Sequence, residues 1–199
     1  LSLLTSTLFF KQLAAYLNTK TELAATMLYY TEGTEKIAEQ EYAHMAIAEI
    51  PAEKLSSLID QAGFFERIED ALRENIANQV FAGKISTLSE YFSHTLVNVL
   101  INTLSFLVLF FAVFIILSCI LSILDHVLRF PVLTSLDGLF GGVFGALNAL
   151  LTMYILFLIV PPVLAILPVE FLEKMLAESK LGSFFLRTTF FGFMFRGVI

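Results

Sequence analysis

The sequence predicts an all-α, multi-pass integral membrane protein, in which a transmembrane helical hairpin carries an acidic, amphipathic helical insert. The hairpin is indicated by two long runs without a charged residue, residues 95–124 and 138–169. Because a helix rises about 1.5 Å per residue, roughly 20 apolar residues cross a hydrocarbon core of about 30 Å. The composition agrees, since 57% hydrophobic residues and a mean hydropathy of +0.81 are too apolar for an ordinary soluble domain. A soluble helical protein with a buried hairpin is the alternative.

Residues 1–17 are predicted to be the remnant of a membrane helix. They are apolar apart from Lys11, Gln12 and small hydroxyl residues, and they read as a helix that begins partway along. No basic segment or small-residue cleavage site precedes them, so a signal peptide is not predicted. The segment is either a tilted span or a helix in the membrane plane.

Residues 18–93 are predicted to form an acidic helical insert outside the bilayer, with 13 acidic and 6 basic residues. Capping residues, glycine stops at Gly33, Gly63 and Gly83, and Pro51 divide it into four short helices. The last, over residues 64–82, carries an apolar stripe at helical spacing. We expect this stripe to pack within the insert, with a partner or the membrane surface as alternatives; its members are Phe65, Ile68, Leu72, Ile76 and Val80.

Residues 94–167 are predicted to form the transmembrane hairpin. Thr87 and Glu90 have the spacing of a capping box, which would begin a helix outside the bilayer that continues unbroken into the first span. The second span, over residues 138–160, is predicted to end at Pro161 and Pro162, because two prolines remove two amide donors. The insert would then be coupled directly to the membrane helix.

Residues 168–199 are predicted to lie at the membrane interface. Residues 169–181 place apolar side chains opposite Glu173, Lys174 and Glu178, with Gly182 as the stop. The Phe-rich tail, residues 183–199, is too short and too charged for a third span, so we expect an in-plane segment.

A glycine-rich motif opens the second span. Small residues recur every fourth position on two adjacent rows, which leaves a flat face that another helix backbone can approach closely. Asp137 is expected to cap this helix, since a carboxylate satisfies free amides at the positive end of the dipole. Helix packing is the predicted role of Gly138, Gly141, Gly142, Gly145 and Ala149.

Several polar residues lie in or beside the predicted spans. Polar side chains in lipid turn inward, where they either bond across helices or line a water-filled path. The candidates for such a path are Asn98, Asn102, Ser118, Asp125 and Asn148.

The motifs of common chemistries are missing from the sequence. Glu41 and His44 have a spacing found in di-iron sites, but no second pair accompanies them, so a surface histidine is favoured and no metal or cofactor is predicted. Cys119 is the single cysteine, which excludes an intrachain disulfide. Without nucleophile, phosphate-binding or basic motifs, we predict neither an enzyme nor a nucleic-acid-binding protein.

The glycine-rich motif resembles a family signature. Asp137, Gly141, Phe144 and Gly145 match Asp-Arg-x-x-Gly-x-x-Phe-Gly-x-x-(Arg/Lys)-Gly of the colicin V production protein (CvpA) family, whereas Gly138 and Asn148 stand where the family usually has basic residues. Residues 1–17 are similar to the family's second membrane helix, and by this likeness the family's first helix would be missing here. The likeness covers residues 1–17 and 96–160.

The resemblance implies a small, multi-pass, non-enzymatic protein of the bacterial cytoplasmic (inner) membrane that supports colicin V production or export and envelope homeostasis. Its partners would be the lipid bilayer and other membrane proteins or a second copy. By similarity to the family, whose first turn is basic, the insert is expected outside and residues 125–137 inside. The alternative function is a small channel or transporter that uses the polar residues in the membrane.

Overall fold

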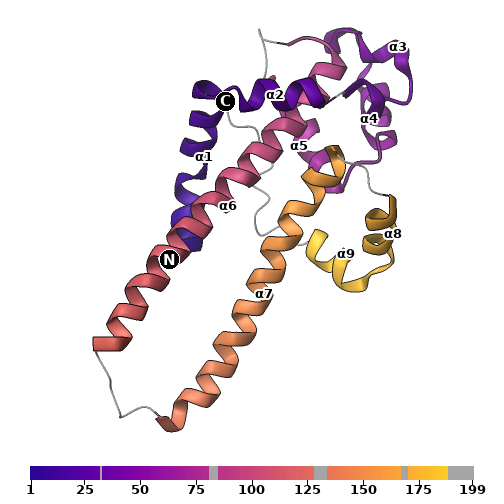
Figure 1. The fold of residues 1–199 in the computed structure, drawn as a ribbon. Coiled ribbons are helices and arrows are strands. Elements are labelled where there is room, and N and C mark those ends of the chain that lie inside the picture. Colours follow the sequence, from indigo (N-terminus) through magenta and orange to yellow (C-terminus); the bar gives the residue numbers. More distant parts are fainter. Residues whose placement is uncertain (32, 81–84, 128–133, 167–169, 188–199) are drawn as a thin grey trace.

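A computed structural model describes the chain except for residues 32, 81–84, 128–133, 167–169 and 188–199. The described residues are helical and contain no strand, although one antiparallel bridge joins Ala46 to Thr87. Two long helices, α6 (Leu88–Val127) and α7 (Thr134–Ile166), extend away from a group of short helices at one end of the molecule (Figure 1). The prediction of an all-α protein is confirmed for this part of the chain.

Helix α1 (Ser2–Lys20) runs antiparallel to α6 and lies along it (Figure 1). Its buried residues, Ser6, Phe10 and Ala14, are four positions apart and therefore face the same side. Ala14 packs against Val97 and Ile101 of α6. The opposite side of α1 exposes apolar side chains, such as those of Leu4 and Leu8. Because α1 also packs lengthwise against a candidate span, the structure favours a tilted membrane helix over a helix in the membrane plane.

The insert wraps the first turns of α6. It consists of α2 (Leu23–Tyr30), a 3-10 turn η1 (Gly33–Lys36), α3 (Gln40–Ala43), a second 3-10 turn η2 (Ile47–Glu49), α4 (Ala52–Gln61) and α5 (Glu66–Ala77). Gly63 ends the α4 turn with a φ of +68°, a conformation that glycine adopts without a steric penalty. Leu58, Ile59, Ile68 and Leu72 form one core with α6.

Helix α5 is shorter than the sequence predicts. It ends at Ala77 because Gln79 takes a φ of 49° and the Val80 amide donates to the Asn75 carbonyl oxygen at 2.9 Å. Ile68 and Leu72 are buried as expected, whereas Val80 lies beyond the helix. The stripe packs inside the chain against α4, α6 and α7.

The capping box that begins α6 forms as predicted. The Glu90 carboxylate accepts hydrogen bonds from the Thr87 amide at 3.1 Å and the Ser86 amide at 3.0 Å, and the Glu90 amide donates to Thr87 Oγ1 at 3.4 Å. Two backbone donors that the helix leaves unpaired are thereby satisfied. Helix α6 then continues for 40 residues without a break.

Replacing Glu90 by alanine is expected to lower the free energy of unfolding by about 1 kcal/mol, within the range for a lost cap. Thermal unfolding in detergent, followed by circular dichroism, measures the change. Glu53→Ala is the control, because Glu53 is exposed in the first turn of α4, which has no side-chain cap. Equal unfolding midpoints for both variants would show that the box does not stabilise the fold.

The far halves of α6 and α7 expose apolar surface. Residues 88–123 and 141–164 are long and apolar enough to cross a membrane, and only 17% of the most apolar stretch of each is buried. The core helix of a soluble protein would be mostly buried. The low burial of these two helices therefore argues against a soluble protein with a buried hairpin. Leu107 and Phe110 pack with Ile155 and Leu158 near the insert, while residues 111–123 and 141–150 are largely exposed.

The prediction that the second helix ends at the two prolines is wrong. Helix α7 continues through Pro161 and Pro162 to Ile166. Both prolines are buried, as are Leu158 and Leu164, and this packing stabilises the turns that prolines weaken. Local propensity is therefore overridden by tertiary contacts.

The C-terminal region also differs from the prediction. Helix α8 (Glu170–Glu178) is separated from α9 (Lys180–Arg187) by the single residue Ser179. Ser179 Oγ accepts a hydrogen bond from the Gly182 amide at 3.1 Å and so caps α9, which places Gly182 inside a helix and not at a stop. A Cβ on Gly182 would lie 3.0 Å from the Leu176 carbonyl oxygen, so glycine permits a close approach. Residues 188–199 of the predicted tail lie outside the described residues.

Candidate functional site

Four side-chain hydrogen bonds tie the start of α6 to four different parts of the chain. We call this set the polar collar. Each bond joins a residue of α6 to a residue from α1, α5, η1 or the end of α2. The pairs are Asn18 Nδ2 to Asn98 Oδ1 at 3.3 Å, Asn75 Nδ2 to Thr95 Oγ1 at 3.1 Å, Thr34 Oγ1 with Ser89 Oγ at 2.7 Å, and Ser93 Oγ to the Thr31 carbonyl oxygen at 3.1 Å.

One pair of the collar is buried and the other three are half-buried. Asn75 and Thr95 are 1% and 0% exposed and Asn98 is 8% exposed, whereas Asn18, Thr34, Ser89 and Ser93 are half-buried. A buried polar group that loses its partner incurs the full cost of its desolvation, so the Asn75–Thr95 pair above all stabilises this arrangement of the helices over a slipped one. The collar therefore fixes the position of the insert on α6.

The four described path residues do not come together. Asn98 and Asn102 are buried between helices, and Asn98 bonds to α1 as interhelical packing predicts. Ser118 and Asn148 lie on exposed surfaces of α6 and α7. The side chain of Asp125 is outside the described residues. The arrangement does not favour the channel or transporter, because no continuous polar route is assembled from the described members.

A buried arginine links the insert to the C-terminal helices. Arg67 of α5 is 8% exposed, and its Nη2 donates to the Phe185 carbonyl oxygen of α9 at 3.0 Å. This carbonyl lies near the C-terminal end of α9, where the helix dipole favours a positive charge. The Phe185 ring also stacks on Phe157 of α7, with 5.2 Å between the ring centroids. Phe185 thus joins α5, α7 and α9 at one point.

Replacing Arg67 by methionine is expected to release α9 and to cost about 1 to 3 kcal/mol, because the buried Phe185 carbonyl loses a donor. Trypsin cleavage after Lys180, which is exposed, should accelerate. Arg73→Met is the matched control, since Arg73 on the same helix makes surface ion pairs with Asp60 and Glu69. Identical cleavage rates in the two variants would contradict this role of Arg67.

The predicted glycine face is open in this chain. A Cβ on Gly141, Gly142 or Gly145 would meet no atom within 4 Å, and Ala149 is exposed. The close approach expected there is therefore not made by any described helix of the same chain. Among the described residues, this face has no partner helix.

Asp137 and Gly138, which precede the three exposed glycines, lie at the start of α7. Helix α7 begins at Thr134, so Asp137 falls inside its first turn and not before it, which corrects the predicted capping position. A carboxylate in the first turn still complements the helix dipole. The surroundings of Asp137 and Gly138 are outside what the structure describes.

The metal hypothesis gains no support from the geometry. Among the described residues, no three His, Cys, Asp or Glu side chains are grouped to hold a metal ion. His44 is exposed at the end of α3, as expected for a surface histidine. The collar consists of amide and hydroxyl side chains and one backbone carbonyl. These groups hydrogen-bond one helix to another.

Sequence reasoning missed most of the residues that form these contacts. Arg67 and Asn75 lie beside the apolar stripe of α5 on its buried side, and their position next to the stripe is the signal that the sequence offers. Asn18 gives no local signal, because its partner lies 80 positions away. The fold and these sites define a helical protein with two candidate membrane spans, the first of which continues into a hydrogen-bonded helical domain.

The family is shown by comparison with known proteins. The family model for the colicin V production protein matches residues 76–189, which is more than half of the chain and includes both candidate spans. The chain belongs to this family, and membership supports a CvpA-type role in colicin V production. Residues 1–17 lie outside the match, so their likeness to the family's second helix stays a prediction. Neither the search of curated proteins nor that of solved structures gives a match.

Proposed function

We propose that this chain is a non-enzymatic, multi-pass protein of the bacterial cytoplasmic membrane that supports colicin V production or export, and envelope homeostasis, by holding partner proteins at the membrane. The observation that carries the proposal is the continuity of α6. Its first turns are held by the polar collar, and its far half exposes apolar side chains. A helix built in this way positions one domain relative to the bilayer.

The partners follow from the surfaces. The lipid bilayer covers the apolar halves of α6 and α7, and the open glycine face accepts a helix of another membrane protein or a second copy of this chain. Nucleic acid is not among the partners, since the net charge is −6. No cofactor is needed for such a role.

The function is tested by complementation in a bacterium that makes colicin V and lacks its own family member. Expression of the chain should restore toxin in the medium, measured by growth inhibition of a sensitive strain. Glu53→Gln, a surface change, should restore it equally. A chain that reaches the membrane and leaves toxin levels at those of the empty vector would contradict the proposal.

Membrane integration has its own test. After carbonate washing and ultracentrifugation, the chain should stay with the membranes until detergent is added. Recovery in the supernatant without detergent would end the membrane assignment, and with it the proposed function.

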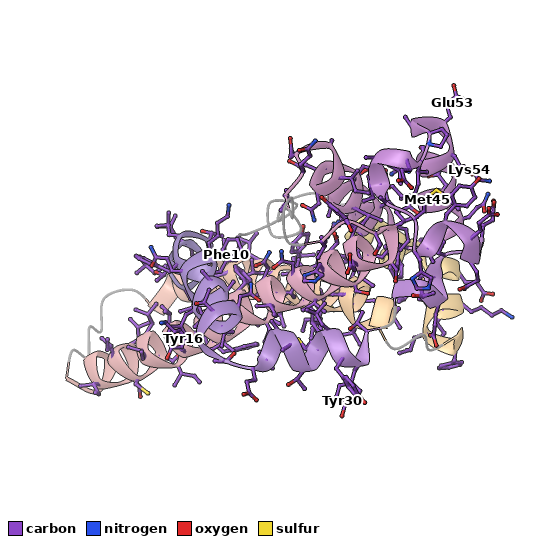
Figure 2. The ribbon with its side chains drawn as sticks, turned by 90° about the horizontal axis from the view of Figure 1, so that it is seen from above. Phe10, Tyr16, Tyr30, Met45, Glu53 and Lys54 are labelled. Atoms are coloured by element: carbon purple, nitrogen blue, oxygen red, sulfur yellow. The ribbon has the colours of Figure 1, made fainter. Side chains whose placement is uncertain are left out.

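Topology is predicted with the insert outside. In a Cys119→Ser background, a cysteine at Glu53 should react with an impermeant maleimide in intact cells, because Glu53 projects outward from α4 (Figure 2). Reaction only after lysis would reverse the topology. Native Cys119, exposed on the apolar half of α6, should be protected from the same reagent by lipid.

A further inference from the structure

An apolar cavity of about 510 Å³ lies between the C-terminal part of α7 and one face of α8. Its size falls within the about 300 to 1,000 Å³ that is usual for small-molecule sites. Helix α7 contributes six lining residues, and α8 with Ser179 contributes four. The lining residues are Leu156, Phe157, Ile159, Val160, Val163, Leu164, Leu172, Met175, Leu176 and Ser179.

The position of the cavity points to lipid. Its α7 wall is the last part of the candidate span that ends at Leu164. Figure 1 shows α8 and α9 beside this end of α7. Leu156 and Met175, both in the lining, are 54% and 53% exposed, so the cavity is continuous with the apolar surface of the span. A membrane-facing surface therefore leads directly into it.

The lining of the cavity offers almost no partners for ordered water. A buried water needs two to four polar partners. The single polar side chain of the lining is Ser179, whose hydroxyl oxygen already accepts the Gly182 amide. A flexible hydrocarbon chain is the ligand that such a lining suits.

The face of α8 that lines the cavity is apolar. Leu172, Met175 and Leu176 share this face, and Lys174 lies on the opposite one, because neighbouring positions on a helix are about 100° apart. Recognition of a ligand on this face is therefore hydrophobic.

We propose that this cavity holds one acyl chain of a phospholipid from the bilayer around α7. The bound lipid would contact both α7 and α8 and would hold the two helices together while it is bound. The site lies outside the collar and the glycine face, and it depends on α7 being in the membrane, which carbonate extraction tests separately.

The test uses the full chain in vesicles of phosphatidylethanolamine and phosphatidylglycerol. A small fraction of the phosphatidylglycerol carries a photoactivatable diazirine at the end of one acyl chain. After irradiation, mass spectrometry of peptides should find cross-links on α8 at Met175 or Leu176 as well as on α7. Native mass spectrometry in mild detergent should find phospholipid retained by the chain.

Val160→Phe fills the cavity from α7 and should reduce both α8 cross-linking and retained phospholipid at least several-fold. Val143→Phe is the matched control, because Val143 is 53% exposed on the same helix away from the cavity. Met175→Trp fills the cavity from α8 and should repeat the loss even if Val160→Phe fails to fold. Cross-linking of α8 that neither filling variant reduces, cross-links on α7 alone, or a retained fatty acid in place of phospholipid would each overturn the proposal.

Discussion

Replacing Phe92 by alanine should destabilise the protein by about 3 to 5 kcal/mol, the usual cost of a deleted core aromatic ring. Phe92 lies on α6 inside the insert and is 0% exposed. Its ring meets Phe64 with 5.7 Å between centroids, in the core that also contains Leu58 and Leu72. Removing it leaves a cavity at the place where α4, α5 and α6 meet.

Thermal unfolding in detergent should therefore show a large fall in midpoint, and the insert should become sensitive to proteases. Phe111→Ala is the matched control on the same helix, because Phe111 is 50% exposed on the apolar half. A surface truncation of this kind changes stability by about 0.5 kcal/mol or less. Equal losses at both positions would mean that α6 is not the centre of the core.

Replacing Gly145 by leucine is expected to weaken association with a partner helix by about 1 to 3 kcal/mol, which is about 5-fold to 150-fold in affinity. The reason is that any side chain there forces the two backbones apart and loses dispersion contacts along the crossing. The fold of the single chain should tolerate the change, because a Cβ on Gly145 meets no atom within 4 Å. Leucine also favours helix over glycine by about 1 kcal/mol.

Energy transfer between labelled chains in bilayers measures self-association, and cross-linking in native membranes measures binding to other partners. Gly142→Leu tests the adjacent row, and Leu150→Phe is the control at an exposed position without a small residue in register. Unchanged association together with an unchanged melting temperature for Gly145→Leu would show that the glycine face does not serve packing.

The parts of the fold that sequence reasoning predicted correctly depend on local interactions. The capping box needs only residues three positions apart. The long apolar runs can be recognised from their own composition, without knowledge of their contacts. A helix within residues 64–82 is confirmed, but its predicted end is wrong. The chain turns at Gln79 with a positive φ, a conformation that usually requires glycine, so the sequence shows no sign of the turn.

The parts that failed depend on distant contacts. Pro161 and Pro162 stay helical because neighbouring helices bury them, and no local rule contains those neighbours. The polar stripe of α6 indicates that Asn98 turns inward. Only the fold shows that Asn18 is its partner and donates a hydrogen bond to it. The glycine spacing predicted a close helix contact, and the described chain contains no helix that makes it.

The length of α6 has a mechanical consequence. Its 40 residues span about 60 Å, about twice the thickness of the hydrocarbon core. In the proposed membrane orientation, one half of α6 lies in the bilayer and the collar holds the other half, so the helix would pivot at the membrane surface. A tilt of about 10° would carry the outer end, about 30 Å from the pivot, through about 5 Å. A change in membrane thickness, or a partner that pulls on the hairpin, would therefore displace the insert.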